Sequence, residues 1–215
     1  MKPATEFVLY ALSIGALALT PTELKSKRIS PYFFNSGLFN SGEESIHLAR
    51  AYAAAALVDL GQEVDVVFGP AYKGIPLAVT TSMAIFQRYG INVGWAFNRK
   101  EVKDHGEGGN VVGYPMKRKR VLIVDDVMTT GASSGEAVDI VLANGGIPIG
   151  EVIAFDRQER GKDTTLSAVQ EFEKKYNVPV CAAATLTDLI SVLKEKAPKS
   201  ESLSEILKYQ EKYGV

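Results

Sequence analysis

The sequence predicts an α/β fold in which a mainly parallel sheet carries helices on both faces. Short runs rich in β-branched and aromatic residues alternate with stretches of helical periodicity, a pattern typical of a doubly wound sheet. The run at 121–124 has no polar alternation, as expected of a strand that is buried on both faces. Polar and glycine-rich motifs follow several of the runs, at the sheet edge where such folds bind ligands.

Composition limits the class of protein. The 215 residues are 46% hydrophobic, enough for one domain with a small appendage. The 24 Lys and Arg residues balance 25 Asp and Glu residues, giving a net charge of −1, so no global charge favours nucleic acid or an anionic membrane as a partner. The single cysteine, Cys181, excludes an intrachain disulfide framework and suits a reducing cytosol. We therefore expect one cytoplasmic domain over 1–215.

The apolar stretch FVLYALSIGALAL (7–19) has two interpretations. With Lys2 ahead of it, it has the length of a signal-peptide core, and it is too short to span a bilayer. Its largest side chains also fall near helical spacing and Glu6 interrupts the positive start, which favours a buried first helix. Because the α/β alternation starts later, we expect residues 1–40 to form a cap over the strand ends.

The alternation itself gives the order of the elements. Strands are expected at 64–68, 93–97, 120–125, 149–155 and 178–184, and helices near 43–60, 74–89, 132–144, 165–176 and 186–196. Residues 98–119 break the pattern, because they hold four glycines, many charges and no apolar period. We predict a structureless insertion there that is either functional or disordered.

The segment RVLIVDDVMTTGASS (120–134) places Asp125 and Asp126 where a buried strand ends. Adjacent residues of an extended chain point opposite ways, so both can ionise without close repulsion. The segment then leads into a helix that we expect to begin near Ser133 or Ser134, and a helix N-terminus preceded by glycine binds phosphate. Carboxylates accept hydrogen bonds from a sugar diol, so the segment suggests a ribose 5-phosphate site. The alternative is a solvated loop with Ser133 as an N-cap.

Two further segments carry basic residues. In FGPAYKG (68–74) two glycines permit a tight turn whose amides face an anion, and Lys73 adds a positive charge; the alternative is an ordinary strand-to-helix turn. In NRKEVKDHGEGG (98–109) basic side chains gather on a glycine-hinged segment, where they can close over a polyanion. The alternative for this second segment is a solvated charge run.

Two motifs suit a flat, acidic ligand. Phe33 and Phe34 are adjacent, so in an extended chain one packs inward and the other can stack on a planar ring; the alternative is that both belong to the core. Arg157 follows the strand at 149–155, where its planar fork matches a carboxylate. The alternative for Arg157 is a surface pair with Asp156.

The segment with two aspartates resembles the 5-phosphoribosyl 1-pyrophosphate (PRPP) binding motif of type I phosphoribosyltransferases. Four further segments resemble, in the same order, blocks of the orotate phosphoribosyltransferases within that family: LKSKRISPYFFNSGLF (24–39), FGPAYKGIPLA (68–78), FNRKEVKDHGEGGNVVG (97–113) and FDRQERG (155–161). The resemblance covers nearly the whole chain. It departs from the pattern at Lys27, which stands where glycine precedes the arginine.

The resemblance assigns roles to residues of this chain. It implies that the catalytic residues are Lys103, His105, Asp125 and Asp126. It implies that PRPP is bound by Lys25, Tyr72, Lys73, Arg99, Lys100, Lys103, His105, Asp125, Asp126, Val127, Met128, Thr129, Thr130, Gly131, Ala132 and Ser133. It implies that orotate is bound by Phe33, Phe34, Thr129 and Arg157.

The resemblance also implies the type I phosphoribosyltransferase fold with a small N-terminal hood, and transfer of the phosphoribosyl group of PRPP to orotate in pyrimidine synthesis. Inversion at the sugar C1 through an oxocarbenium-like transition state is expected. Mg²⁺ is expected to bind mainly through substrate oxygens, without a dedicated protein cage. A homodimer is expected in which the mobile loop (98–119) reaches the partner's active site.

Two other functions fit parts of the pattern. One is a phosphoribosyltransferase for another base. The other is a regulator that senses PRPP and binds nucleic acid, against which the loop pattern and the balanced charge argue.

Overall fold

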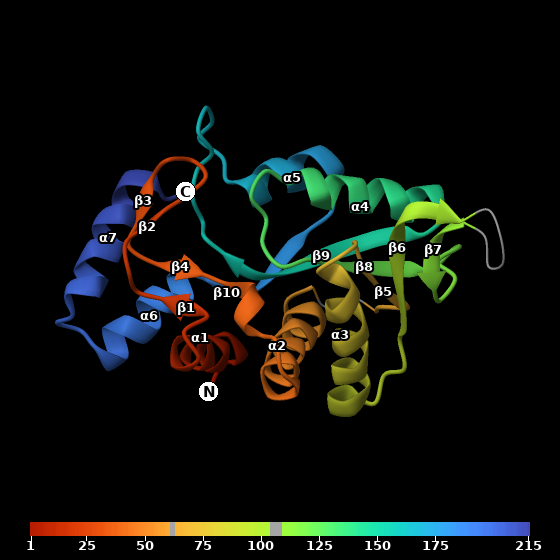
Figure 1. Ribbon diagram of the computed structural model, residues 1–215, viewed down its shortest axis with the longest axis horizontal. Coiled ribbons are helices and arrows are strands. Elements are labelled where there is room, and N and C mark those ends of the chain that lie inside the picture. The colour runs from red at the N-terminus through yellow and green to blue at the C-terminus, as the bar shows by residue number, and fades with distance from the viewer. Residues whose placement is uncertain (61–62, 104–108) are drawn as a thin grey trace.

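The computed structural model describes residues 1–60, 63–103 and 109–215 and is built on a six-stranded sheet (Figure 1). The strand order is β10-β9-β8-β5-β6-β7, and all neighbours pair in parallel except β6 and β7. The strands are β5 (Val66–Gly69), β6 (Gly94–Lys103), β7 (Gly109–Gly113), β8 (Arg120–Val124), β9 (Ile147–Asp156) and β10 (Val180–Thr185). The predicted mainly parallel sheet is confirmed.

Helices cover both faces of this sheet (Figure 1). The pair α4 and α5 packs on one face, and α1, α2 and α3 pack on the other, with α6 beside α1 and α7 beside α6. The helices are α1 (Pro3–Ser13), α2 (Gly42–Ala54), α3 (Gly74–Tyr89), α4 (Ala132–Ala143), α5 (Ala168–Tyr176), α6 (Leu186–Lys196) and α7 (Glu201–Tyr213), with a π-helical turn at Ala55–Asp59. Six of these helices were predicted, with α1 as the buried first helix, and α7 was not.

The strand β8 shows why its sequence is apolar without alternation. Val121 and Ile123 belong to the core beneath α4 and α5, and Leu122 and Val124 belong to the larger core on the other face. All four side chains are fully buried. Burying each of them contributes roughly 1.5–3 kcal/mol, which holds the strand in the middle of the sheet.

The N-terminal region differs from the expected cap. Phe7, Val8 and Ala11 are buried, and α1 packs against α2, α6 and β10, so the buried-helix interpretation is confirmed. However, α1 lies in the helical layer and not over the strand ends, so the prediction of a cap over all of 1–40 was wrong. Two small antiparallel sheets and a 3-10 turn (Ser36–Leu38) form the region beyond it, with strands β1 (Leu17–Ala18), β2 (Thr22–Glu23), β3 (Ile29–Ser30) and β4 (Phe33–Phe34). We call residues 17–38 the cap.

The segment 98–119 is more regular than predicted. β6 continues to Lys103, and β7 returns antiparallel beside it, so the expectation of a structureless insertion was wrong at both ends. Val111 packs against the core beneath α4 and α5, which gives the returning strand an apolar contact. Within the part of the chain that the structure describes, no helix is long and apolar enough to cross a membrane.

The loop between β5 and α3 is closed by contact between two glycines, as its sequence predicted. A Cβ on Gly69 would lie 1.8 Å from the carbonyl oxygen of Gly74, and a Cβ on Gly74 would lie 2.6 Å from the carbonyl carbon of Gly69. Any larger residue at either position would have to separate the two backbones. The Asn98 side chain, from β6, also accepts a hydrogen bond from the Ala71 amide at 2.8 Å, so the neighbouring strand fixes the same loop.

Gly69→Ala is expected to lower the free energy of unfolding by at least about 2 kcal/mol, because the backbone must shift to admit the new Cβ. The matched control is Gly42→Ala in the first turn of α2, where a Cβ would meet nothing within 4 Å. That variant is expected to stay within about 0.5 kcal/mol of the parent. Urea denaturation measures both, and equal stability of the two variants would contradict the contact.

Candidate active site

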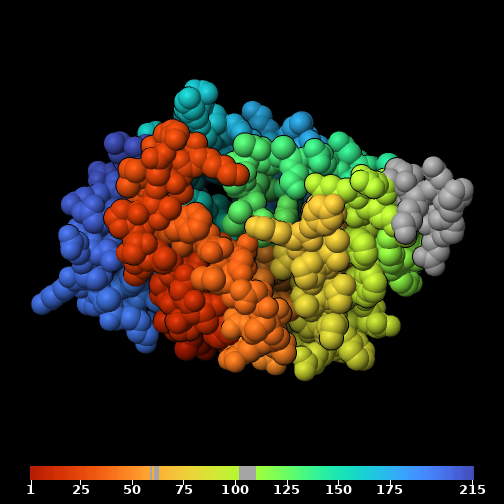
Figure 2. Space-filling model, in the orientation of Figure 1, coloured from red at the N-terminus to blue at the C-terminus, as the bar shows by residue number. Residues whose placement is uncertain are grey.

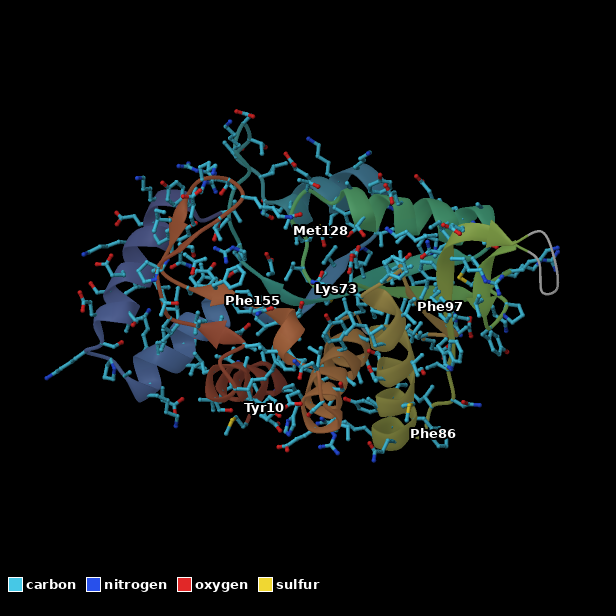
Figure 3. The ribbon with its side chains drawn as sticks, in the orientation of Figure 1. Tyr10, Lys73, Phe86, Phe97, Met128 and Phe155 are labelled. Atoms are coloured by element: carbon cyan, nitrogen blue, oxygen red, sulfur yellow. The ribbon has the colours of Figure 1, made fainter. Side chains whose placement is uncertain are left out.

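The predicted residues meet at the carboxyl ends of the parallel strands. Asp125 and Asp126 follow β8, and Lys73 follows β5, which is the strand beside it. The Lys73 Nζ lies 2.6 Å from an Asp126 carboxylate oxygen. Figure 3 shows Lys73 at the N-terminal end of α3, close to the segment that carries Met128. The strand-end placement expected from the sequence is confirmed for this group.

Asp125 shapes the loop after β8. Its side chain is 9% exposed and accepts hydrogen bonds from the Asp126 amide at 2.8 Å and the Ser133 hydroxyl at 3.1 Å. The buried Tyr52 hydroxyl donates to its carbonyl oxygen at 2.7 Å. Burial and the neighbouring Asp126 charge raise the pKa of Asp125, while the two hydrogen bonds lower it less. The alternative of a solvated loop residue was wrong.

Asp126 faces a different set of partners. One carboxylate oxygen accepts from Lys73 Nζ at 2.6 Å and from the Ser36 hydroxyl at 2.9 Å, and the other accepts from the Val127 amide at 2.8 Å. Burial raises the pKa of Asp126, but the hydrogen bonds from Lys73 and Ser36 outweigh it and hold the pKa below its ordinary value. The two carboxylates point apart, as the sequence predicted. Ser36 was not predicted, because the sequence gives no sign that a serine of the cap contacts the residues that follow β8.

The segment before α4 has the features of an anion site. Gly131 has φ 71° and lies directly before α4, whose N-terminus receives no side-chain capping bond. Such a helix end offers unpaired amides and a positive partial charge. Thr129, Thr130 and Ser133 are exposed around it. The helix begins at Ala132, slightly earlier than predicted, and Ser133 binds Asp125 instead of capping.

Two residues of this segment do not present side chains to a ligand. Val127 and Met128 are partly buried against the two apolar cores. Their contribution to a phosphate site is therefore confined to the backbone.

The basic residues assigned to PRPP are only partly brought together. Tyr72 is 71% exposed, and Lys100 Nζ lies 5.3 Å from the centre of its ring. Arg99 and Lys100 lie on β6. The side chain of Lys103 and all of His105 lie outside the described residues.

Lys25 stands apart from the rest of the predicted site. It is exposed in the turn between β2 and β3, and no contact joins it to the other site residues that the structure describes. Lys27 in the same turn has φ 66°, the conformation that glycine adopts readily. Lys27 therefore has a backbone conformation that would suit the glycine of the family pattern.

The two phenylalanines separate as expected. Phe34 is buried and stacks on Phe155 with ring centres 5.6 Å apart, whereas Phe33 is 39% exposed. Figure 3 places Phe155 on the cap side of Lys73. Phe34 therefore packs into the core, and the ring of Phe33 remains accessible to a ligand.

Arg157 is held by a partner that was not predicted. One of its terminal nitrogens, Nη2, donates to Glu159 at 2.5 Å and to the Ser30 hydroxyl at 2.9 Å, and its guanidinium lies 4.4 Å from the centre of the Tyr32 ring. The alternative pair with Asp156 was wrong. Glu159 also accepts from the hydroxyls of Tyr32 and Tyr209, both at 3.1 Å. The arginine is therefore oriented by the cap, by Glu159 and, through Glu159, by α7.

The predicted site residues at the strand ends lie around an open hollow. Figure 2 shows this hollow between the red-orange cap and the green segment after β8, with the β5–α3 loop below it. A separate cavity of about 710 Å³ is lined by Arg28, residues 160–165 and Tyr213. It contains none of the predicted site residues.

No cluster of three or more His, Cys, Asp or Glu side chains is arranged to hold a metal within the described residues. A metal ion at this site would have to take most of its ligands from a substrate. Asp126 suits the remaining position, because its carboxylate is ionised and lies at the edge of the hollow beside Lys73.

Comparison with known proteins gives the same assignment as the motifs. Residues 39–199 match the phosphoribosyl transferase domain family. Orotate phosphoribosyltransferase from Yersinia enterocolitica is 49% identical over 210 residues, covering 98% of this chain and 97% of that protein. The protein of the same name from Escherichia coli is 49% identical over 216 residues, covering all of both chains. The chain belongs to the orotate phosphoribosyltransferase family.

A solved orotate phosphoribosyltransferase from Francisella tularensis supports this membership at the level of the fold. It is 37% identical with a TM-score of 0.87, and the match covers 97% of this chain and 99% of that one. The type I fold expected from the resemblance is confirmed. The cap and all of α7 lie outside the 39–199 match, yet the matches to the full-length relatives cover both.

Asp125→Asn and Asp126→Asn are expected to keep the fold but to lower kcat/KM for PRPP by about tenfold to a hundredfold, because an amide is a weaker acceptor for the diol than a carboxylate. The control is Asp139→Asn, which removes an exposed carboxylate from α4. Steady-state kinetics and thermal melts separate activity from folding. Parent-like kcat/KM in both site variants would return the two aspartates to a purely structural role.

Proposed function

We propose that this chain transfers the phosphoribosyl group of PRPP to orotate, giving orotidine 5′-monophosphate and pyrophosphate in pyrimidine synthesis. The observation that carries the proposal is the meeting of two carboxylates, a lysine and an uncapped helix N-terminus at one sheet edge. This set matches a ligand that has a phosphate, a diol and a pyrophosphate. The full-length relatives bear the name of this activity.

PRPP would bind with its 5-phosphate at the N-terminus of α4 and its diol at Asp125 and Asp126. Lys73 would face the pyrophosphate. Its present pair with Asp126 involves a side chain that is 69% exposed, and exposed pairs contribute about 0–1 kcal/mol. Lys73 can therefore turn from Asp126 to a substrate phosphate at little cost.

Departure of pyrophosphate leaves positive charge on the ribose ring, and the carboxylates lie where they would stabilise it. A ring nitrogen of orotate then bonds to C1 from the opposite side. Lys103 and His105 would neutralise or protonate the departing pyrophosphate and exclude water. When bound, Mg²⁺ would neutralise negative charge on the pyrophosphate, and Asp126 would be its protein ligand.

Orotate would lie between the cap and the end of β9. The exposed ring of Phe33 offers a stacking surface, and the Thr129 hydroxyl offers a hydrogen bond. Arg157 would pair with the orotate carboxylate. Because Glu159 and Ser30 already hold Nη2 of Arg157, the guanidinium is oriented before the substrate arrives.

A homodimer would complete the site. Large apolar side chains are exposed along α3, near the start of β6 and just after the end of β7, namely Met83, Phe86, Ile91, Trp95 and Tyr114. Figure 3 shows Phe86 near the end of α3, pointing away from the core. An exposed apolar patch of this kind favours contact with another protein surface. By the family resemblance, the 98–119 loop of a second copy would act at the first copy's active site.

The direct test is the consumption of orotate, followed by absorbance, with PRPP and Mg²⁺ present. Hypoxanthine, adenine and uracil in place of orotate test the alternative of a different base. Turnover of one of these bases but not of orotate would favour that alternative. Tight PRPP binding without any turnover would favour a regulator.

Arg157→Ala is expected to raise the KM for orotate by an amount equivalent to about 2–3 kcal/mol, because a charged hydrogen-bond partner is lost. The KM for PRPP is expected to change little. Arg88→Ala, an exposed arginine at the end of α3, is the control and should leave both constants near the parent values. Equal losses for the two substrates would reject the pairing with the orotate carboxylate.

Subunit mixing tests the shared loop. Lys103→Ala and the double variant Asp125→Asn, Asp126→Asn should each be nearly inactive. If Lys103 acts on the partner's site, heterodimers hold one site with both defects and one with neither. A random equal mixture should then recover about a quarter of the parent activity by site counting.

If Lys103 acts in its own subunit, every heterodimer site carries one defect and no activity should return. Subunit exchange is verified independently by mixing tagged and untagged parent chains. No recovery despite verified exchange would reject the shared loop and leave the enzyme assignment unaffected.

A further inference from the structure

The strand β9 carries a carboxylate that the proposed reaction does not use. Glu151 is fully buried in the middle of the strand. Its register partners are Ile123 in β8 and Val180 in β10, both apolar. One carboxylate oxygen accepts a hydrogen bond from the buried Ser134 hydroxyl at 2.7 Å, and the other has no hydrogen-bond partner in the described part of the chain.

This carboxylate lies beneath the anion site. Asp125 is two residues beyond Ile123, so Asp125 and Glu151 point to the same face of the sheet. Two consecutive serines in the first turn of α4 bind them, with Ser133 donating to Asp125 and Ser134 donating to Glu151. The turn that would receive the 5-phosphate is therefore attached to the sheet at two acidic side chains.

We propose that Glu151 and Ser134 position the first turn of α4, and that Glu151 must be uncharged for this turn to bind the PRPP phosphate well. PRPP affinity then depends on the protonation of a residue that never touches PRPP. The inference rests on the proposed function, because it concerns the same phosphate site.

The charges around Glu151 favour its neutral form. After β8, Asp125 is the charged residue on the same face as Glu151. From α5, Glu173 accepts a hydrogen bond from the amide of Val180, which is the register partner of Glu151 in β10. From α2, the Tyr52 hydroxyl donates to the Asp125 carbonyl oxygen. From α4 it faces the uncharged Ser134. None of the ion pairs within the described ranges includes Glu151. A buried carboxyl without a cation is more stable protonated.

The pKa of Glu151 agrees with this geometry. Burial, opposed by the Ser134 hydrogen bond and aided by the Asp125 charge, raises it from 4.5 to about 8. Below that pH the α4 N-terminus keeps its positive partial charge for the phosphate. Above it, a second negative charge beside Asp125 cancels part of that attraction and repels the ligand.

The first test compares PRPP binding by the parent and by Glu151→Gln, using calorimetry between pH 7 and 9.5 at constant ionic strength. Glutamine keeps the shape and stays neutral. The parent is expected to lose affinity by about threefold to tenfold more than Glu151→Gln over this range. Glu136→Gln, which removes an exposed carboxylate from the same helix, should follow the parent. Parallel profiles for the parent and Glu151→Gln would overturn the proposal.

Ser134→Ala gives a readout that a merely structural contact would not produce. The Ser134 hydroxyl stabilises the charged form of Glu151, so its removal should move the midpoint of the affinity loss to higher pH. A general weakening of PRPP binding with an unchanged midpoint would contradict the proposed role of the pair.

Two measurements do not depend on PRPP, and the second of them needs only the parent chain. Between pH 4.5 and about 8 the folded parent holds a proton that the unfolded chain releases, so its Tm should fall with rising pH relative to Glu151→Gln. Infrared spectroscopy of the parent should show a protonated buried carboxyl at pH 7 that disappears near pH 8. Loss of PRPP affinity without that spectral change would overturn the inference.

Absence of PRPP binding at every pH would instead overturn the proposed function, and the inference with it.

Discussion

The carboxylate of Asp126 is the contact on which the arrangement of the site depends. It joins three segments that are distant in sequence, since Ser36 comes from the cap and Lys73 from the β5–α3 loop. Its backbone carbonyl also accepts a hydrogen bond from Ala154 in β9. Because its pKa is lowered, the group stays charged while it makes these bonds. The cap, the β5–α3 loop and the central sheet are therefore all hydrogen-bonded to Asp126 before any ligand is present.

The sheet was predictable from the sequence because its strands are buried on both faces. A run such as the one in β8 admits few other structures, and the motifs after each strand follow from the parallel arrangement. The cap and α7 were harder to predict, because strands of two residues and an amphipathic terminal helix leave weak local signals. The contacts of Ser36 and Asn98 depend on tertiary packing alone.

Two buried carboxylates near the site, Glu159 and Glu151, were not predicted from the sequence. Arg157 was expected to pair with a ligand carboxylate or, alternatively, with Asp156, whereas the structure pairs it with Glu159. Gln158 between them has φ 51°, so the extended backbone ends there and the sequence pattern does not show that the two side chains meet. Glu151 interrupts an otherwise apolar strand, and an isolated acid in a buried run is itself a sign of a special environment. The contact of Glu159 therefore depends on a turn, whereas Glu151 had a usable signal in the sequence.

The packing of α7 gives the carboxyl end of the chain a practical importance. Tyr209 binds Glu159, and the Val215 amide donates to the Gln158 carbonyl oxygen at 3.1 Å, one residue away from Arg157. Met1 is 86% exposed and lies below α1, away from α4 (Figure 1). An affinity tag fused after Val215 could disturb the Gln158 backbone next to Arg157, in the proposed orotate site. A tag placed before Met1 would leave this backbone undisturbed. Recombinant protein for kinetic work should therefore carry its tag at the N-terminus.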